Sequence, residues 1–218
     1  YQAMPPGLYS NIWGIFVGIT NYQAAGYNGL LNATRDARDL SRTLEEVCGL
    51  RRPILLLDGQ ATHRALEEAF AEIGRRDSQS DLFVFHFSGH GFGVESKDTG
   101  TKAGYMLLHD APPPDNFNLG RGLLNMSLLQ RMAETAGIDA KHQLYLLDCC
   151  YSGMGARARN VLTRDIASDA AQANLKDMLS QRGNYIITAG GAGQPVLDGP
   201  SGPDGGYGLL SGFLVRTL

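Results

Sequence analysis

The sequence lacks any long hydrophobic run. Its longest apolar stretch, 12–19, is interrupted by Gly14 and Gly18 and is far shorter than the ~20 residues that a membrane span needs. The N-terminus has no basic flank followed by an apolar stretch, so no signal peptide is predicted. We therefore expect no membrane partner and a cytoplasmic location. Because the first residue is Tyr1 rather than Met, we expect a piece of a longer chain.

Cysteine is also scarce, and neither sign of charge dominates. The three cysteines, Cys48, Cys149 and Cys150, form a poor disulfide framework and fit a reducing compartment better. No Cys/His spacing resembles a zinc site. The 19 basic and 22 acidic residues give a formal net charge of -3, which provides no general attraction for nucleic acid. The cysteines therefore need another explanation, either packing or catalysis.

What the sequence does contain is an alternation of strand-like and helix-like segments. A chain of 218 residues with 43% hydrophobic residues fits one globular domain. Such an alternation predicts an α/β fold with a mostly parallel sheet and helices on both faces. The expected strands are 12–19, 54–57, 82–87, 105–108, 144–147 and 185–188, and the expected helices are 33–47, 62–75, 125–136 and part of 165–179.

Two segments place reactive side chains just after predicted core strands. His90 follows the strand that ends near Phe87, and Cys150 follows the strand that ends near Asp148. In open α/β sheets, ligands bind beyond the carboxyl ends of the strands. The two side chains are therefore expected at the same edge of the sheet.

A cysteine and a histidine at one edge can perform nucleophilic catalysis. The imidazole generates the thiolate, which attacks a carbonyl carbon, and later protonates the leaving group. Backbone N–H groups of Gly91 and Cys150 are the natural donors for an oxyanion hole. Two alternatives stay open at this point. His90 could be a loop histidine bonded to backbone, and Cys149 could be the nucleophile.

The motifs around these residues resemble a known family. Ser88-Gly89-His90-Gly91 is similar to the histidine motif of the caspase–metacaspase clan. The segment 148–153 resembles the Asp-x-Cys-x-Ser-Gly motif of metacaspases and bacterial orthocaspases, and differs from the Gln-Ala-Cys-x-Gly of caspases proper. The resemblance covers about 12–188, with weaker support to 218. It implies a caspase-like three-layer α/β/α sandwich around a mostly parallel six-stranded sheet, in a peptidase domain over 11–218 after an N-terminal extension, 1–10.

The resemblance also implies residue roles. Cys150 matches the nucleophile and His90 the base, which leaves Cys149 facing the core. Asp36, Ser88 and Asp148 match residues of an S1 pocket. Two neighbouring carboxylates repel each other unless a cation lies between them, and a substrate Arg or Lys would be that cation.

The expected function is therefore a cysteine endopeptidase that cleaves after Arg or Lys. Its partners would be protein or peptide substrates with those residues at P1, together with regulatory domains or activator proteins. Simpler interpretations of the pocket residues stay open. Asp148 could accept loop N–H groups, Asp36 could be an exposed helix acid paired with Arg35 or Arg38, and Ser88 could be an ordinary turn residue.

No cofactor is predicted. Many metacaspases resemble one another in an acidic calcium cluster, but here the segment 154–159 is basic and the loop after His90 offers only Glu95 and Asp98. Calcium prefers six to eight oxygen ligands, so we expect calcium independence. The basic residues between 157 and 182 fit a solvated face, or sites of autoprocessing.

Two other functions remain as alternatives. One is a non-catalytic caspase-like domain used for interaction or scaffolding, although such domains usually lose the histidine or the cysteine. The other is a different Cys–His hydrolase or transferase that acts on a small ester or amide. The glycines of 190–193 and 202–208 match no complete phosphate-binding pattern and are interpreted as flexible loops.

Overall fold

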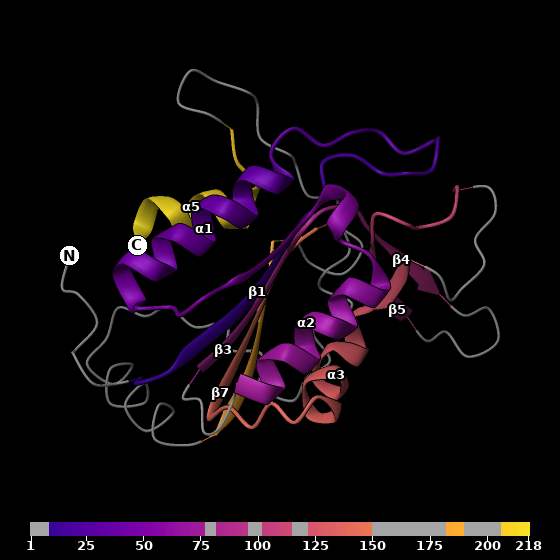
Figure 1. Ribbon diagram of the computed structural model, residues 1–218. Helices are drawn as coiled ribbons and strands as arrows, with labels where there is room; N and C mark the ends of the chain where they lie inside the picture. Colours follow the sequence, from indigo (N-terminus) through magenta and orange to yellow (C-terminus); the bar gives the residue numbers. More distant parts are fainter. Residues whose placement is uncertain (1–8, 77–81, 96–101, 115–121, 150–181, 190–205) are drawn as a thin grey trace.

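A parallel five-stranded sheet forms the centre of the fold (Figure 1). The computed structural model describes residues 9–76, 82–95, 102–114, 122–149, 182–189 and 206–218. In the sheet order β2-β1-β3-β7-β8, the strands are β2 (Ile54–Leu57), β1 (Ile12–Gly18), β3 (Leu82–Ser88), β7 (His142–Asp148) and β8 (Gly183–Thr188). The three central strands are almost fully buried, as expected for a parallel sheet covered on both faces.

Helices cover both faces of this sheet, which confirms the predicted α/β class. Figure 1 shows α1 (Ala33–Cys48) and α5 (Leu209–Thr217) on one face, and α2 (His63–Arg76) and α3 (Leu129–Thr135) on the other. The predicted start of α2 is confirmed by its cap, because the Ala65 N–H donates to Thr62 Oγ1 at 3.2 Å.

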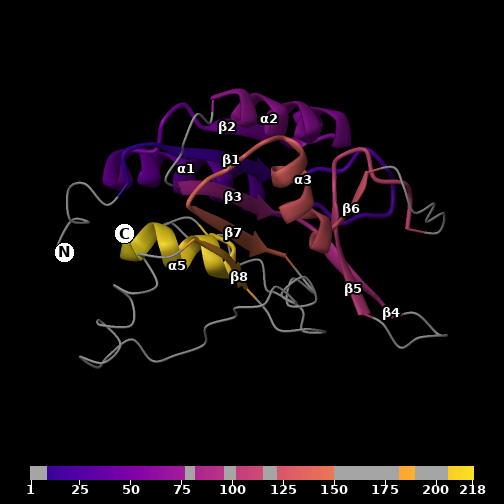
Figure 2. The same ribbon diagram turned by 90° about the horizontal axis from the view of Figure 1, so that it is seen from below.

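A second, antiparallel sheet lies beyond the carboxyl end of β3 (Figure 2). It consists of β4 (Gly91–Glu95), β5 (Lys102–Leu107) and β6 (Leu123–Asn125). The strand expected at 105–108 belongs to this sheet. The described residues therefore contribute five strands to the central sheet, not the six expected.

The predicted start of the third helix, at Asn125, is wrong. Asn125 ends β6, and its side chain accepts the Ser127 N–H at 2.9 Å. A 3-10 turn, η2 (Met126–Leu128), follows before α3 begins. A short polar side chain that bonds to backbone two residues ahead favours a turn over a helix interior. A second 3-10 turn, η1 (Asp58–Gln60), follows β2.

The two faces of the sheet carry separate cores. The face under α2 and α3 holds the larger apolar cluster, which includes Phe70, Phe83, Phe85 and Tyr145. The face under α1 and α5 holds a smaller one, which includes Phe16 and Leu40. Buried polar side chains accompany the smaller core, and the candidate site lies among them.

Candidate active site

The carboxyl ends of β3 and β7 lie level with each other at the candidate site. Ser88 pairs with Asp148 in the ladder, and the Gly89 N–H donates to the Asp148 carbonyl at 3.4 Å. His90 comes two residues after Ser88, and Cys150 two residues after Asp148. Cys150 itself lies outside the described residues, so the predicted pairing with His90 is not part of the described geometry.

The imidazole of His90 is held by the loop between β1 and α1. Its Nε2 lies 2.7 Å from the carbonyl oxygen of Asn28. A carbonyl oxygen only accepts hydrogen bonds, so Nε2 must carry the proton. In the neutral ring Nδ1 then carries the lone pair, which is the state that a general base requires.

The main chain of His90 is fixed on both sides. Its N–H donates to the Tyr22 hydroxyl at 2.7 Å, and its carbonyl accepts the Leu107 N–H at 3.0 Å. Because hydrogen-bonded and non-hydrogen-bonded pairs alternate in an antiparallel ladder, the next pair, Gly91 with Met106, is non-hydrogen-bonded. The N–H of Gly91 therefore points away from β5, as the predicted oxyanion donor would need.

Two tyrosine rings accompany the imidazole. The centroids of the Tyr22 and His90 rings are 5.1 Å apart with an interplanar angle of 32°. Tyr27 lies 5.3 Å from Tyr22 and 6.3 Å from the imidazole, and its hydroxyl donates to the Pro112 carbonyl at 2.5 Å. Burial raises the pKa of Tyr22 well above its ordinary value, so the phenol stays protonated.

The three predicted S1 residues converge under the start of α5. Ser88 Oγ donates to Asp36 Oδ2 at 2.9 Å, and the Gly208 N–H donates to the same carboxylate at 3.0 Å and 3.1 Å. The Ser211 N–H donates to Asp148 Oδ2 at 2.8 Å. Both carboxylates thus receive N–H groups of the α5 N-terminus, where the helix dipole favours negative charge.

The approach of α5 to the acids is close. A Cβ on Gly208 would lie 2.5 Å from Asp148 Oδ2 and 2.8 Å from Asp36 Oδ2. Only a glycine lets the main chain reach both carboxylates at once. The preceding residue anchors this segment to α1, because the Tyr207 hydroxyl donates to Asp39 at 3.0 Å. The interpretation of 202–208 as flexible loop is therefore wrong for Gly208.

Burial decides between the interpretations of the acids. Asp36 is 1% exposed and Asp148 is 5% exposed. The alternative of an exposed helix acid is wrong for Asp36, since Arg35 pairs with Asp39 instead. Asp148 does accept a main-chain N–H, as the simpler interpretation expected, although the donor belongs to α5. The S1 role itself stays a prediction.

A buried histidine completes this polar layer. His86 lies within β3, and its Nε2 is 2.9 Å from Ser211 Oγ. Desolvation lowers the pKa of His86 to about 3, so the ring is neutral near pH 7. The structural role predicted for this residue fits its position, and its partner on α5 is the same residue whose N–H bonds Asp148.

The remaining cysteines take the predicted packing positions. Cys149 is 2% exposed and belongs to the apolar cluster under α2 and α3. Cys48 is half-buried against the cluster under α1 and α5, where burial raises the pKa of its thiol. Inaccessible thiols such as Cys149, and thiols of raised pKa such as Cys48, are poor nucleophiles.

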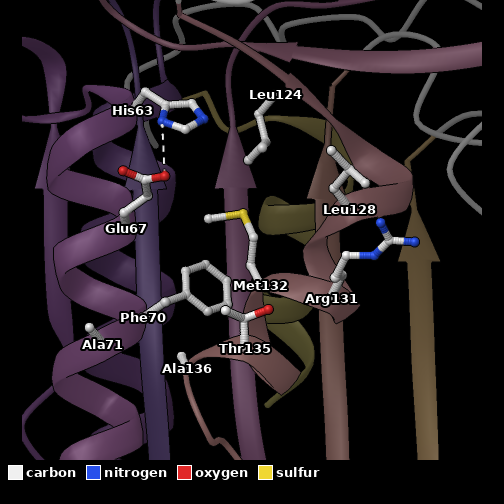
Figure 3. Close-up of a pocket in the computed structure, with 10 residues that line it drawn as sticks. All are labelled: His63, Glu67, Phe70, Ala71, Leu124, Leu128, Arg131, Met132, Thr135 and Ala136. Carbon is white, nitrogen blue, oxygen red and sulfur yellow. Dashed lines mark ion pairs between the residues drawn. The ribbon is translucent and has the colours of Figure 1, made fainter.

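A groove of about 460 Å³ lies away from this site, between α2 and α3. Figure 3 shows side chains of the two helices facing each other across it, with the His63–Glu67 ion pair at its edge. Its lining includes neither His90 nor the two acids.

In the part of the chain that the structure describes, no three side chains among His, Cys, Asp and Glu gather as metal ligands would. Asp98 lies outside that part, so the calcium prediction stays open. Within the same residues, no helix has the length and apolar character needed to cross a membrane.

Comparison with known proteins agrees with this geometry. The caspase domain model of peptidase family C14 matches residues 13–194. The chain belongs to the caspase family. The structure is also similar to the crystal structure of protein GSU0716 from Geobacter sulfurreducens, with a TM-score of 0.63 and 18% identity over 95% of this chain and 81% of that chain. This second likeness concerns the fold alone. No curated protein matches the sequence.

Membership of the caspase family makes this a cysteine-peptidase domain and confirms the family predicted from the two motifs. Sequence reasoning missed Tyr22, Asn28 and Gly208, which contact the predicted site residues. Tyr22 and Asn28 follow the carboxyl end of β1, where a ligand-facing loop is expected. No local signal distinguished Gly208 from its glycine-rich surroundings.

Proposed function

We propose that this chain is an active cysteine endopeptidase of the metacaspase or orthocaspase kind, which cleaves after Arg or Lys. The observation that carries the proposal is the convergence of Asp36 on Ser88 and Asp148, which stand two residues before His90 and Cys150 in the sequence. Such a layer of buried acids beside a held histidine is what recognition of a basic P1 side chain requires. The proposed domain is 11–218.

The dyad would work in the usual order for a thiol peptidase. Nδ1 of His90 takes the proton of the Cys150 thiol, and the thiolate attacks the scissile carbonyl carbon. The N–H groups of Gly91 and Cys150 bind the oxyanion. The imidazolium then gives its proton to the leaving amine, and water hydrolyses the thioester with His90 again as the base.

Specificity would come from the two acids. The carboxylates of Asp36 and Asp148 would accept hydrogen bonds from the basic side chain, since a carboxylate can accept about four. A guanidinium or ammonium between them would relieve their mutual repulsion. Protein substrates with Arg or Lys at P1 and autoprocessing of the basic segment 157–182 follow from this preference, and activator proteins are a further part of the proposal.

A second candidate function is a non-catalytic interaction or scaffold domain. The observation that favours it is the burial of both acids under the start of α5, at 1% and 5% exposure. A substrate side chain reaches them only if residues near Gly208 move. A domain that never binds a basic residue could keep α5 docked there permanently.

Cleavage of matched fluorogenic peptides tests the proposal. Peptides that end in Arg, Lys, Asp or Ala are compared for wild type and Cys150→Ala, each with calcium and with a chelator. We expect cleavage after Arg and Lys, its loss in Cys150→Ala, and no response to the chelator. The calcium comparison tests the predicted calcium independence.

The other outcomes separate the alternatives. Cleavage that persists in Cys150→Ala contradicts the nucleophile assignment. Cleavage of Ala peptides as fast as Arg peptides contradicts the S1 acids. If the folded wild type cleaves no peptide and Cys150 reacts no faster than the buried thiol of Cys149, the scaffold function is supported.

A further inference from the structure

We propose that Tyr22 is a positioning residue for the catalytic histidine. Its hydroxyl fixes the main chain of His90, and its ring stabilises the imidazolium that forms when His90 takes the thiol proton. Tyr27 packs beside the ring of Tyr22 and helps to hold it. This inference rests on the proposed peptidase function and deepens it.

The Tyr22 hydroxyl holds the main chain of His90. The Tyr22 oxygen lies 2.7 Å from the His90 nitrogen and accepts its N–H. A Cβ on Gly89 would lie 2.9 Å from the same oxygen, so the phenol reaches the chain because residue 89 is glycine. With the Leu107 N–H on the His90 carbonyl, both peptide groups of His90 are held. Tyr22 holds the peptide that carries the His90 N–H, whereas Leu107 holds the next one, which carries the Gly91 N–H.

The Tyr22 ring lies against the imidazole of His90. The Tyr22 ring centroid lies 5.1 Å from that of the imidazole, inside the ~6 Å range in which an aromatic face attracts a cation. Tyr27 lies 6.3 Å from the imidazole, just beyond that range, but only 5.3 Å from Tyr22. The bond of Tyr27 to the Pro112 carbonyl holds it in place. Tyr22 therefore contacts the base directly, and Tyr27 acts through it.

A packing role alone would not produce this arrangement. One loop contacts His90 at three points. The Asn28 carbonyl lies at the imidazole Nε2, the Tyr22 hydroxyl at the main-chain N–H, and the Tyr22 ring against the imidazole ring. The other titratable groups near Tyr22 are Tyr27 in the same loop, Asp58 at the end of β2 and Cys149 at the end of β7. The substitutions below leave these three groups unchanged.

The test measures alkylation of Cys150 by iodoacetamide against pH, which needs no peptide substrate. Tyr22→Met keeps similar volume but removes the aromatic face and the hydroxyl. Because the imidazolium loses stabilisation, we expect the thiolate to form only at higher pH, with a midpoint raised by about half a unit. Peptide kcat is expected to fall about tenfold, while KM changes little.

Two further variants separate the hydroxyl from the ring. Tyr22→Phe keeps the ring, so we expect an unchanged alkylation midpoint and a kcat about tenfold lower. Tyr185→Phe is the matched control, since Tyr185 lies on β8 with its ring against His142. It is expected to behave as wild type in both measurements.

The outcomes distinguish failure of the Tyr22 role from failure of the proposed peptidase function. If His90→Ala leaves the wild-type alkylation profile unchanged, the proposed dyad fails. If His90→Ala changes the profile but Tyr22→Met keeps the wild-type midpoint, the ring half of this inference is overturned. A wild-type kcat in Tyr22→Phe overturns the hydroxyl half. Should Tyr22→Met not fold, Tyr22→Leu is measured in its place.

Discussion

The two faces of the sheet differ in what they bury. The face under α2 and α3 buries an almost entirely apolar cluster built on Phe70, Phe83 and Phe85. The face under α1 and α5 buries a polar layer as well, in which Asp36, Asp148 and His86 bond to Ser88, Gly208 and Ser211. Burying polar groups costs free energy unless they are bonded, so we expect such a layer to serve function more than stability.

Substitutions on the two faces are therefore expected to change different properties, stability on one face and activity on the other. Those on the apolar face should lower stability and leave the activity of the folded enzyme unchanged. Those in the polar layer should change activity or its pH dependence more than their effect on packing explains.

The largest expected effect lies on the apolar face. Phe70 is 2% exposed and packs against Phe83 and Phe85, each at a ring distance of 5.7 Å. Phe70→Ala should lower the free energy of unfolding by about 3–5 kcal/mol, measured by urea titration. Below the unfolding transition, cleavage of an Arg peptide per folded molecule should stay within about twofold of wild type. A much larger loss of activity would break the distinction between the faces.

The next effect comes from His86 and depends on pH. Its folded pKa is lowered to about 3, whereas the unfolded chain binds the proton near 6.5. Stability from this group is therefore complete above pH 6.5 and is lost as the pH falls toward 3. Between pH 7 and pH 5 the loss should be about 2 kcal/mol.

His86→Gln provides the comparison, because an amide does not titrate in this range. The difference in unfolding free energy between pH 7 and pH 5 should be smaller in His86→Gln than in wild type by that amount. Equal pH dependence in the two proteins would mean that the pKa of the His86 ring is about the same in the folded and the unfolded chain.

A smaller effect, on specificity, is expected at Gly208. Its φ of -57° and ψ of 156° are allowed for alanine, so the substitution strains no backbone. The added methyl would press on both carboxylates, which lie 2.5 Å and 2.8 Å from it. Gly208→Ala should lower the preference for Arg over Ala peptides about tenfold, or ~1.4 kcal/mol, mainly through KM.

Gly59→Ala is the control for this substitution, because its Cβ would have only ordinary contacts, the nearest at 3.9 Å. Alkylation of Cys150 should be the same in both variants, since neither touches His90. If Gly208→Ala keeps the full Arg preference, the acids beneath it hold α5 and do not form the S1 pocket.

The sequence predicted the fold and the chemistry unequally well, for physical reasons. The strand 82–87 was recoverable because burial on both faces makes it an almost continuous apolar run, and the helix 33–47 because burial of one face imposes a period of 3.6. The observed elements, Leu82–Ser88 and Ala33–Cys48, end within a residue of the predictions. The start of α3 was missed because Asn125 makes a local bond that competes with the helix.

The candidate site was predictable only where a motif was local. His90 could be recognised because glycines flank it, and Asp148 because it ends a predicted strand. The contacts of Tyr22 with His90 and of Gly208 with Asp36 join residues 68 and 172 positions apart, and no pattern in one sequence encodes such a distance. Only the fold brings the β1–α1 loop and the start of α5 to the same edge.

The smallest expected effect is at the groove of Figure 3, and it sharpens the comparison of the two faces. Glu67 forms an ion pair with His63 across one helical turn at 3.6 Å, and the Glu67 side chain is largely exposed whereas that of His63 is partly buried. Glu67→Gln should change the free energy of unfolding by no more than about 0.5 kcal/mol. Peptide cleavage and Cys150 alkylation should match wild type, because the groove includes none of the predicted site residues. A loss of cleavage with stability unchanged would show that the groove takes part in substrate binding, and function would then not be confined to the polar face.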